Sequence, residues 1–201
     1  MIYKDKYSPE FGQKVISFCE NLGMTPDYFI VCSYFESGGT FSPTIKNKYS
    51  NAVGIIQYMP QTCAFLLGVP ASEIRKMTSA QLSVYTHIFE QMTAIEQLDY
   101  AEKYFRPYKN KLKTLEDTYM AILLPTAIGK PNDAVIFDKN DPKYLKRYLQ
   151  NKGLDYNKDG IVTKEEAARR VKELYVAGLK KEIDLQKYFA DVEARGLENI
   201  V

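Results

Sequence analysis

SYFESGGTF, residues 33–41, places a single carboxylate, Glu36, between bulky apolar side chains and a pair of glycines. Thr25-Pro26-Asp27 has the pattern of a helix start and Gly38-Gly39 the pattern of a helix stop, so we expect a helix that ends near Glu36. Phe29, Cys32 and Ser33 precede Glu36 by seven, four and three residues and share its face of that helix. The carboxyl group therefore belongs to a largely apolar stripe, and we expect burial to raise its pKa.

Helical periodicity continues over most of the chain. Ser8-Pro9 begins a predicted helix that Gly23 ends, Thr78 opens another with a capping box, and Thr114 opens an apolar helix that Pro125 ends or kinks. Only residues 134–137 have the pattern of a strand, while residues 42–57 resemble a long loop or short hairpin beside Glu36. We therefore predict an all-α fold with a minor β element.

Length and composition limit the classes of protein. A chain of 201 residues can form one compact domain with a small appendage, and its 27 Lys and Arg against 25 Asp and Glu give no electrostatic reason to expect nucleic acid as a partner. Asp and Lys become dense only after about residue 138. We therefore divide the chain into residues 1–137 and a second module, residues 138–201, packed on the first.

The amino-terminal residues MIYKDKYSPEFGQKV lack the apolar core of a signal peptide, and no stretch reaches the roughly 18 apolar residues of a membrane span. We expect synthesis in the cytoplasm and no membrane span. The three cysteines, Cys19, Cys32 and Cys63, lie in apolar surroundings without metal-ligand spacing, and we interpret them as small buried side chains without a structural disulfide.

A second motif is DYNKDGIVTKEE, residues 155–166, which fits the EF-hand calcium loop pattern D-x-[DN]-x-[DN]-G-x5-E at every position. Gly160 would permit the sharp turn. The flanking sequence predicts an entering helix from Asp141 and an exiting helix capped by Thr163. A single loop of this kind is more typical of a structural calcium site than of a sensor, because sensors usually pair two. The predicted calcium ligands are Asp155, Asn157, Asp159, the carbonyl of Ile161, Thr163 and Glu166.

The segment around Glu36 resembles the catalytic region of the lysozyme-like lytic transglycosylases that cut peptidoglycan. The shared elements are Glu-Ser-Gly at residues 36–38, Ser-Pro at 42–43 and Gly-x-x-Gln-x-Met-Pro-x-Thr from Gly54. Segments resembling residues 111–137 followed by a calcium-type loop also occur in lysozyme-like enzymes of bacteriophages and prophages. The resemblance implies a lysozyme-like fold, peptidoglycan as substrate, and delivery by a virion or a lysis apparatus, with other virion proteins as further partners.

In the resembled family the residue at Glu36 donates a proton to the glycosidic oxygen between N-acetylmuramic acid and N-acetylglucosamine and then acts as a base. The 6-hydroxyl of the sugar attacks the anomeric carbon and leaves a 1,6-anhydro end, so one essential carboxylate is enough. The amide of Gln57 would contact the sugars. The candidate substrate contacts are Ser37, Gly54, Gln57, Tyr58 and Tyr119.

The sequence departs from the family in its third motif, Ala-Tyr-Asn-Ala-Gly. Pro125 and Thr126 stand where the tyrosine and asparagine are expected. Tyr119, on the preceding helix, could supply a phenol from another position, although burial in the core is the more ordinary role of such a residue. Two alternatives therefore stay open beside a lytic transglycosylase: a lysozyme-type hydrolase that leaves reducing ends, and a noncatalytic peptidoglycan-binding or virion structural protein.

Overall fold

The computed structural model describes residues 1–194, with side chains described as far as Ala190. The described chain is mostly helical with one two-stranded antiparallel sheet, which confirms the predicted all-α class with a minor β element. The elements are α1 (Pro9–Leu22), α2 (Pro26–Glu36), α3 (Pro60–Leu66), α4 (Ala71–Ile74), α5 (Ser79–Glu90), α6 (Ala94–Phe105), α7 (Leu115–Leu123), β1 (Val135–Asp138), α8 (Pro142–Asn151), β2 (Ile161–Thr163) and α9 (Lys164–Ala194).

The local signals in the sequence set most helix boundaries. The Ser8 hydroxyl accepts a hydrogen bond from the Phe11 N–H at the start of α1, and Gly23 ends that helix in the left-handed conformation. Thr78 forms the expected capping box at the start of α5. Since α7 ends at Leu123, just before Pro125, the predicted stop at that proline is also confirmed.

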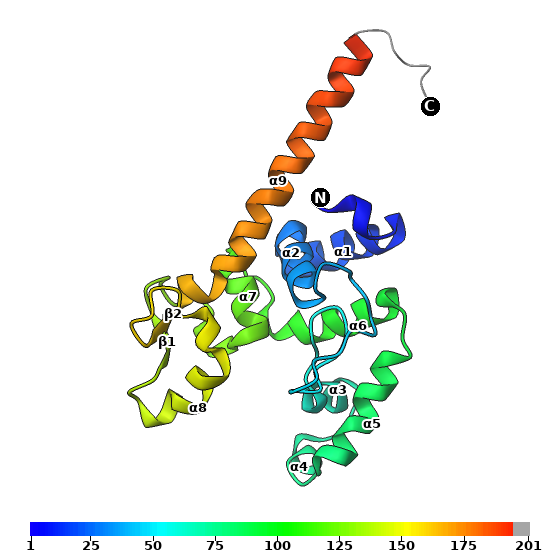
Figure 1. The fold of residues 1–201 in the computed structure, drawn as a ribbon. Coiled ribbons are helices and arrows are strands. Elements are labelled where there is room, and N and C mark those ends of the chain that lie inside the picture. Colours follow the sequence, from blue (N-terminus) through cyan, green and yellow to red (C-terminus); the bar gives the residue numbers. More distant parts are fainter. Residues whose placement is uncertain (195–201) are drawn as a thin grey trace.

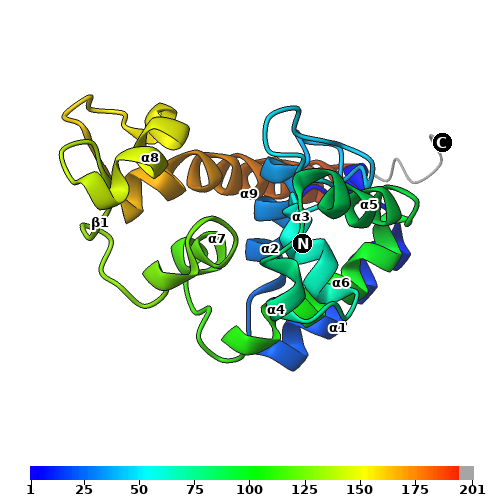
Figure 2. The ribbon, with the colours of Figure 1, turned by 90° about the horizontal axis from the view of Figure 1, so that it is seen from below.

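Helices α2 and α7 lie in the middle of the molecule, between a unit formed by α3 to α6 and a unit formed by α8 and the small sheet (Figure 2). The long helix α9 packs along α7 and α2, and its carboxyl-terminal part extends beyond the rest of the chain (Figure 1). The hydroxyl of Tyr3 donates to the Leu174 carbonyl at 2.6 Å, and Tyr28 meets Tyr175 edge to face. These contacts fasten α9 to the amino-terminal region.

One hydrophobic core runs through both predicted modules. It joins Phe29 and Phe105 to Val162 and Val171, which belong to the calcium-type loop and α9. The predicted boundary after residue 137 falls inside β1, which pairs with β2, so β1 belongs structurally with the second module. Residues 195–201 of that module lie outside the described part of the chain. Within the described part, no helix has the length and apolar character needed to cross a membrane.

Candidate active site

Glu36 is the last residue of α2, as the sequence predicts. The chain then turns sharply, with Gly38 and Gly39 both at positive φ, a conformation that glycine adopts without steric cost. The Ser37 side chain is fully buried, and its hydroxyl accepts a hydrogen bond from the Phe41 N–H at 2.9 Å. Ser37 therefore holds the turn after Glu36 and has no exposed surface for the predicted contact with substrate.

Burial raises the pKa of Glu36 to about 7. The carboxyl group follows residues 29–33 of the same helix, which are fully buried, and the ring of Phe35 packs edge to face on Tyr119. None of the described residues supplies Glu36 with a hydrogen bond or an ion pair that would offset the loss of hydration. The expected rise in pKa is confirmed, and a large fraction of Glu36 carries its proton at neutral pH.

Residues 45–58 form a folded-back loop beside α2, closed by isolated bridges between Lys46 and Val53 and between Val53 and Tyr58. The Ser33 hydroxyl donates to the Ile55 carbonyl at 2.8 Å, which ties the loop to the helix that carries Glu36. This arrangement agrees with the predicted long loop or short hairpin beside Glu36.

Gln57 holds this loop together. Its Nε2 donates to the carbonyls of Ile45 and Gly54, each at 3.2 Å, and its backbone has a positive φ of 52°. Since both bonds use the amide nitrogen, the Oε1 atom is the side-chain group left to accept a hydrogen bond from a sugar. The predicted contact therefore has a structural role that the sequence pattern did not reveal.

A buried glutamine on α6, Gln97, is a further organising residue that sequence reasoning missed. Its Oε1 accepts from the Ile55 N–H at 3.0 Å, and its Nε2 donates to the carbonyls of Pro43 and Phe89. Gly54 lies directly against this amide, and a Cβ at position 54 would collide with it. One signal was available, because Gln97 precedes the apolar residues Ala101 and Phe105 by four and eight positions and so lies on the buried stripe of its helix.

The two tyrosines among the predicted substrate contacts lie in the core. Tyr58 is 2% exposed, its hydroxyl donates to the Gln97 carbonyl and its ring packs against Phe89. Tyr119 is 3% exposed and packs on Phe35. The prediction that Tyr58 contacts the substrate is therefore wrong, because its side chain is buried, and Tyr119 occupies the core position that was its more ordinary role.

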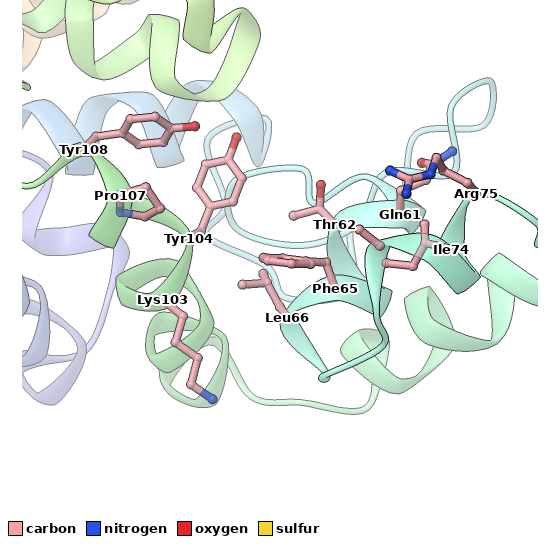
Figure 3. Close-up of a pocket in the computed structure, with 11 residues that line it drawn as sticks. Gln61, Thr62, Phe65, Leu66, Ile74, Arg75, Lys103, Tyr104, Pro107 and Tyr108 are labelled. Carbon is pink, nitrogen blue, oxygen red and sulfur yellow. The ribbon is translucent and has the colours of Figure 1, made fainter.

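Two other tyrosines are Tyr104, which lies near Glu36, and Tyr108, which lies in the turn after α6. Tyr104 lies at the end of α6, and its hydroxyl donates a hydrogen bond to the Ala121 carbonyl on α7 at 2.7 Å. Burial, followed by the charges of Tyr108 and Glu36, raises the pKa of Tyr104. Both tyrosines line a pocket together with α3 and α4 (Figure 3). The sequence signals did not single them out, because their place depends on how α6 packs against α2 and α7.

The calcium-type loop has the backbone turns that its sequence requires. Lys158 and Gly160 have positive φ, and a Cβ at Gly160 would collide with the side chain of Lys139. Asn157 and Asp159 bond to each other, while Glu166 forms the predicted capping box with Thr163 through its Oε2 atom. β1 pairs with the strand of this loop, so that strand finds its partner within the same chain.

The residues of the loop fit a cation in one specific respect. Asp155 Oδ2 accepts from the Tyr148 hydroxyl and the Gly160 N–H, while Asp155 Oδ1 is the one buried side-chain polar atom among the described residues that has no hydrogen-bond partner. Buried polar atoms without partners are uncommon, and a bound cation would satisfy this one. In the described part of the chain no three acidic, histidine or cysteine side chains already converge as a metal cluster.

The loop is connected to α7 through a buried ion pair. Lys164, the first residue of α9, is 2% exposed and donates to Asp117 Oδ1 at 2.6 Å and to the Lys130 carbonyl at 2.7 Å. The same Asp117 oxygen accepts from the Gly129 N–H. The pair therefore joins the end of the loop to the segment that follows α7, where the sequence departs from the family pattern.

Comparison of the sequence with protein-family models and with curated proteins finds no match.

Proposed function

We propose that this protein is a muralytic enzyme with a lysozyme-like fold that cleaves the β-1,4 bond between N-acetylmuramic acid and N-acetylglucosamine, with Glu36 as general acid. The observation that carries the proposal is the position of Glu36 at the end of α2, where burial raises its pKa to about 7. Cleavage of a glycoside requires a protonated carboxyl group that delivers its proton as positive charge develops at the anomeric carbon. The choice of peptidoglycan as substrate rests on the motifs around Glu36, which occur in the same order in the lytic transglycosylases that they resemble.

In the proposed reaction, Glu36 protonates the bridging oxygen and the carboxylate that remains then accepts the proton of the attacking hydroxyl. If that hydroxyl is the 6-hydroxyl of the same muramic acid, the product carries a 1,6-anhydro end and one carboxylate serves both steps. If it is water, the product is a reducing end. We favour the transglycosylase, in line with the resemblance, and delivery by a bacteriophage virion or lysis apparatus.

Replacement of Glu36 by glutamine tests the role of the acid. The Glu36→Gln protein should stay folded and lose nearly all clearing of purified murein, because an amide has no acidic proton to donate. Glu20→Gln, an exposed glutamate near the end of α1, is the matched control and should clear murein at the wild-type rate. Equal clearing by Glu36→Gln and wild type would refute the catalytic assignment, and no clearing by the wild type would favour a noncatalytic binding protein.

Mass spectrometry of the released fragments separates the two reactions. Anhydro products are about 18 Da lighter than hydrolysed ones, the mass of one water. Mostly reducing-end products would identify a lysozyme-type hydrolase and leave the role of Glu36 as acid unchanged.

We further propose a structural calcium ion in the loop at residues 155–166. Its side-chain ligands would be Asp155, Asn157, Asp159, Thr163 and Glu166, together with the carbonyl of Ile161. The partnerless buried oxygen of Asp155 and the positive φ of Gly160 support this proposal. The ion would stabilise the loop and would take no part in bond cleavage, since Glu36 supplies the acid.

A further inference from the structure

The pocket beside Tyr104 has the size and lining of a ligand site. Its volume is about 460 Å³, within the roughly 300–1,000 Å³ of small-molecule sites. One wall is formed by the outer face of α3 and by α4, and the opposite wall by the end of α6 and the turn that follows it (Figure 3). The residues used below are Phe65, Arg75, Tyr104 and Tyr108.

Aromatic surface is available in this pocket. Phe65 is 61% exposed although its neighbours on α3, Cys63 and Ala64, are fully buried. Tyr108 is partly buried, and burial raises the pKa of its hydroxyl, which has no hydrogen-bond partner among the described residues. A ring with one apolar face and a free hydroxyl suits a sugar, because pyranose rings present apolar C–H faces and polar edges.

The charge in the pocket is positive. None of the residues that line it is acidic, and Arg75 stands at the end opposite Tyr104 and Tyr108 (Figure 3). Within the described chain the Arg75 guanidinium has no ion-pair partner. The other lining cation, Lys103, points away from the pocket and lies over the Tyr100 ring, 4.6 Å from its centre. Arg75 is therefore the one lining cation placed to bind a carboxylate in the bidentate geometry that arginine favours.

Tyr104 connects this pocket to the candidate active site. It lines the pocket, and its hydroxyl bonds to Ala121 on α7, two residues beyond the Tyr119 that packs on Phe35. Phe35 immediately precedes Glu36. The charge of Glu36 contributes to the raised pKa of Tyr104, so this tyrosine is a neighbour of the carboxyl group as well as a lining residue of the pocket.

We propose that this pocket binds a muramoyl-peptide unit next to the cleaved bond, with a sugar ring on Phe65 and Tyr108 and a carboxylate of the stem peptide on Arg75. This inference rests on the proposed function, and it adds that a carboxylate of the substrate contributes to binding beside the cleaved bond. A neutral N-acetylglucosamine oligomer can contact the aromatic surface but has no carboxylate to pair with Arg75.

Binding to the Glu36→Gln protein tests the proposal without cleavage of the ligand. The probes are a muropeptide of two disaccharides with tetrapeptide stems and the neutral tetramer of N-acetylglucosamine, each titrated by calorimetry. A Phe65→Ala substitution added to the Glu36→Gln protein should lower its affinity for both ligands by roughly 5- to 10-fold, because one aromatic contact is lost. An Arg75→Gln substitution added to the same protein should lower the affinity for the muropeptide by a similar factor and leave the affinity for the neutral tetramer unchanged.

Matched controls lie outside the pocket. Tyr188→Ala removes an aromatic ring on α9 that is 62% exposed, close to the exposure of Phe65, and Lys76→Gln removes the cation next to Arg75 in sequence. Both should bind both ligands as the parent does. Thermal melting checks that each variant is folded.

The outcomes separate this inference from the proposed function. If Phe65→Ala and Arg75→Gln bind like the controls while wild type clears murein and Glu36→Gln does not, the pocket assignment is wrong and the enzyme assignment stands. If Arg75→Gln weakens both ligands equally, the stem-peptide carboxylate is the wrong partner. If Glu36→Gln still clears murein, the catalytic proposal fails whatever the pocket binds.

Discussion

At the end of α2, the negative charge of Glu36 has no described group to stabilise it. Burial raises its pKa to about 7, and folding therefore holds a proton that the unfolded chain would release near its ordinary pKa of 4.5. The same burial that suits the residue for acid catalysis lowers the stability of the folded protein at pH values above about 4.5, where the unfolded chain loses the proton.

The raised pKa of Glu36 should make the rate of murein cleavage depend on pH. The reactive form of Glu36 is protonated, so activity should fall as the pH rises through about 7, with a slope approaching tenfold per pH unit beyond it. The measurement is the initial cleavage rate of soluble glycan strands between pH 5 and 9, with circular dichroism confirming that the fold persists. A rate unchanged up to pH 9 would show that a different group sets the protonation state.

The raised pKa of Glu36 should also make the free energy of unfolding depend on pH. The pKa of the folded state is raised, so the folded protein binds more protons than the unfolded chain between about pH 4.5 and 7, and stability falls as pH rises across that window. The Glu36→Gln substitution removes this loss of stability, because the glutamine side chain does not ionise. The variant should match the wild type at pH 4 and exceed it by up to roughly 3 kcal/mol at pH 8, from about 1.4 kcal/mol per unit of pKa shift.

Urea unfolding of both proteins at the two pH values measures this difference. Glu20→Gln again provides the control and should show no such dependence on pH, since Glu20 is exposed. A Glu36→Gln protein less stable than wild type at pH 8 would contradict the burial argument.

At the scale of elements, local signals located the helix ends well and the loop only in outline. The caps at Ser8, Thr78 and Thr163 need only a side chain and the backbone three residues away, so their patterns are readable from sequence. The roles of Gln57 and Gln97 depend on carbonyls and amides brought together by folding. For the same reason the sequence could place Glu36 at a helix end and could not show that Tyr58 lies in the core.

The loop of residues 45–58 offers a test of how tightly it is held against α6. Gly54 and Gly68 both have positive φ, 81° and 93°, so alanine strains the backbone similarly at either site. Only at Gly54 would the new Cβ collide with a neighbour, the buried amide of Gln97, whereas Gly68 has nothing within 4 Å. Gly54→Ala should therefore destabilise the protein more than Gly68→Ala does, by roughly 1–3 kcal/mol, the cost of overpacking.

Thermal or urea unfolding of the two glycine variants gives the comparison, and murein clearing gives a second readout. Gly54→Ala should also lower the clearing rate, because the displaced loop is bonded through Ile55 to the helix that carries Glu36. Equal losses of stability in the two variants would mean that the loop yields without disturbing Gln97.

At the scale of the whole molecule, α9 unites the two predicted modules, and the sequence did not foresee how. The composition shift after residue 138 suggested an appendage, yet Val162, Ala168 and Val171 belong to the same core as Phe29. The buried pair of Lys164 and Asp117 adds a bond between residues 47 positions apart. Such a pair has no signature in sequence, because charged residues are usually exposed and their partners are fixed only by the fold.

This connection decides what calcium should do to the whole protein. The loop leads directly into α9, which packs on α7 and α2, so an ion that orders the loop stabilises the one shared core. At a calcium concentration about 100-fold above its dissociation constant, mass action gives roughly 2.7 kcal/mol of stabilisation. Calcium should therefore raise the single melting midpoint of the whole chain, and a chelator should lower it.

The variants for this test come from the loop itself. The double variant Asp155→Ala, Glu166→Gln removes two carboxylate ligands and should melt at the same temperature with calcium and with chelator. Glu165→Gln, an exposed glutamate next to Glu166 and outside the ligand pattern, should respond like the wild type. Murein cleavage at low temperature should persist in every folded sample, since the acid at Glu36 does not involve the ion. A wild-type midpoint indifferent to calcium would remove the metal from this protein, and reversible loss of cleavage in a folded, chelated sample would show that the ion acts on the active site.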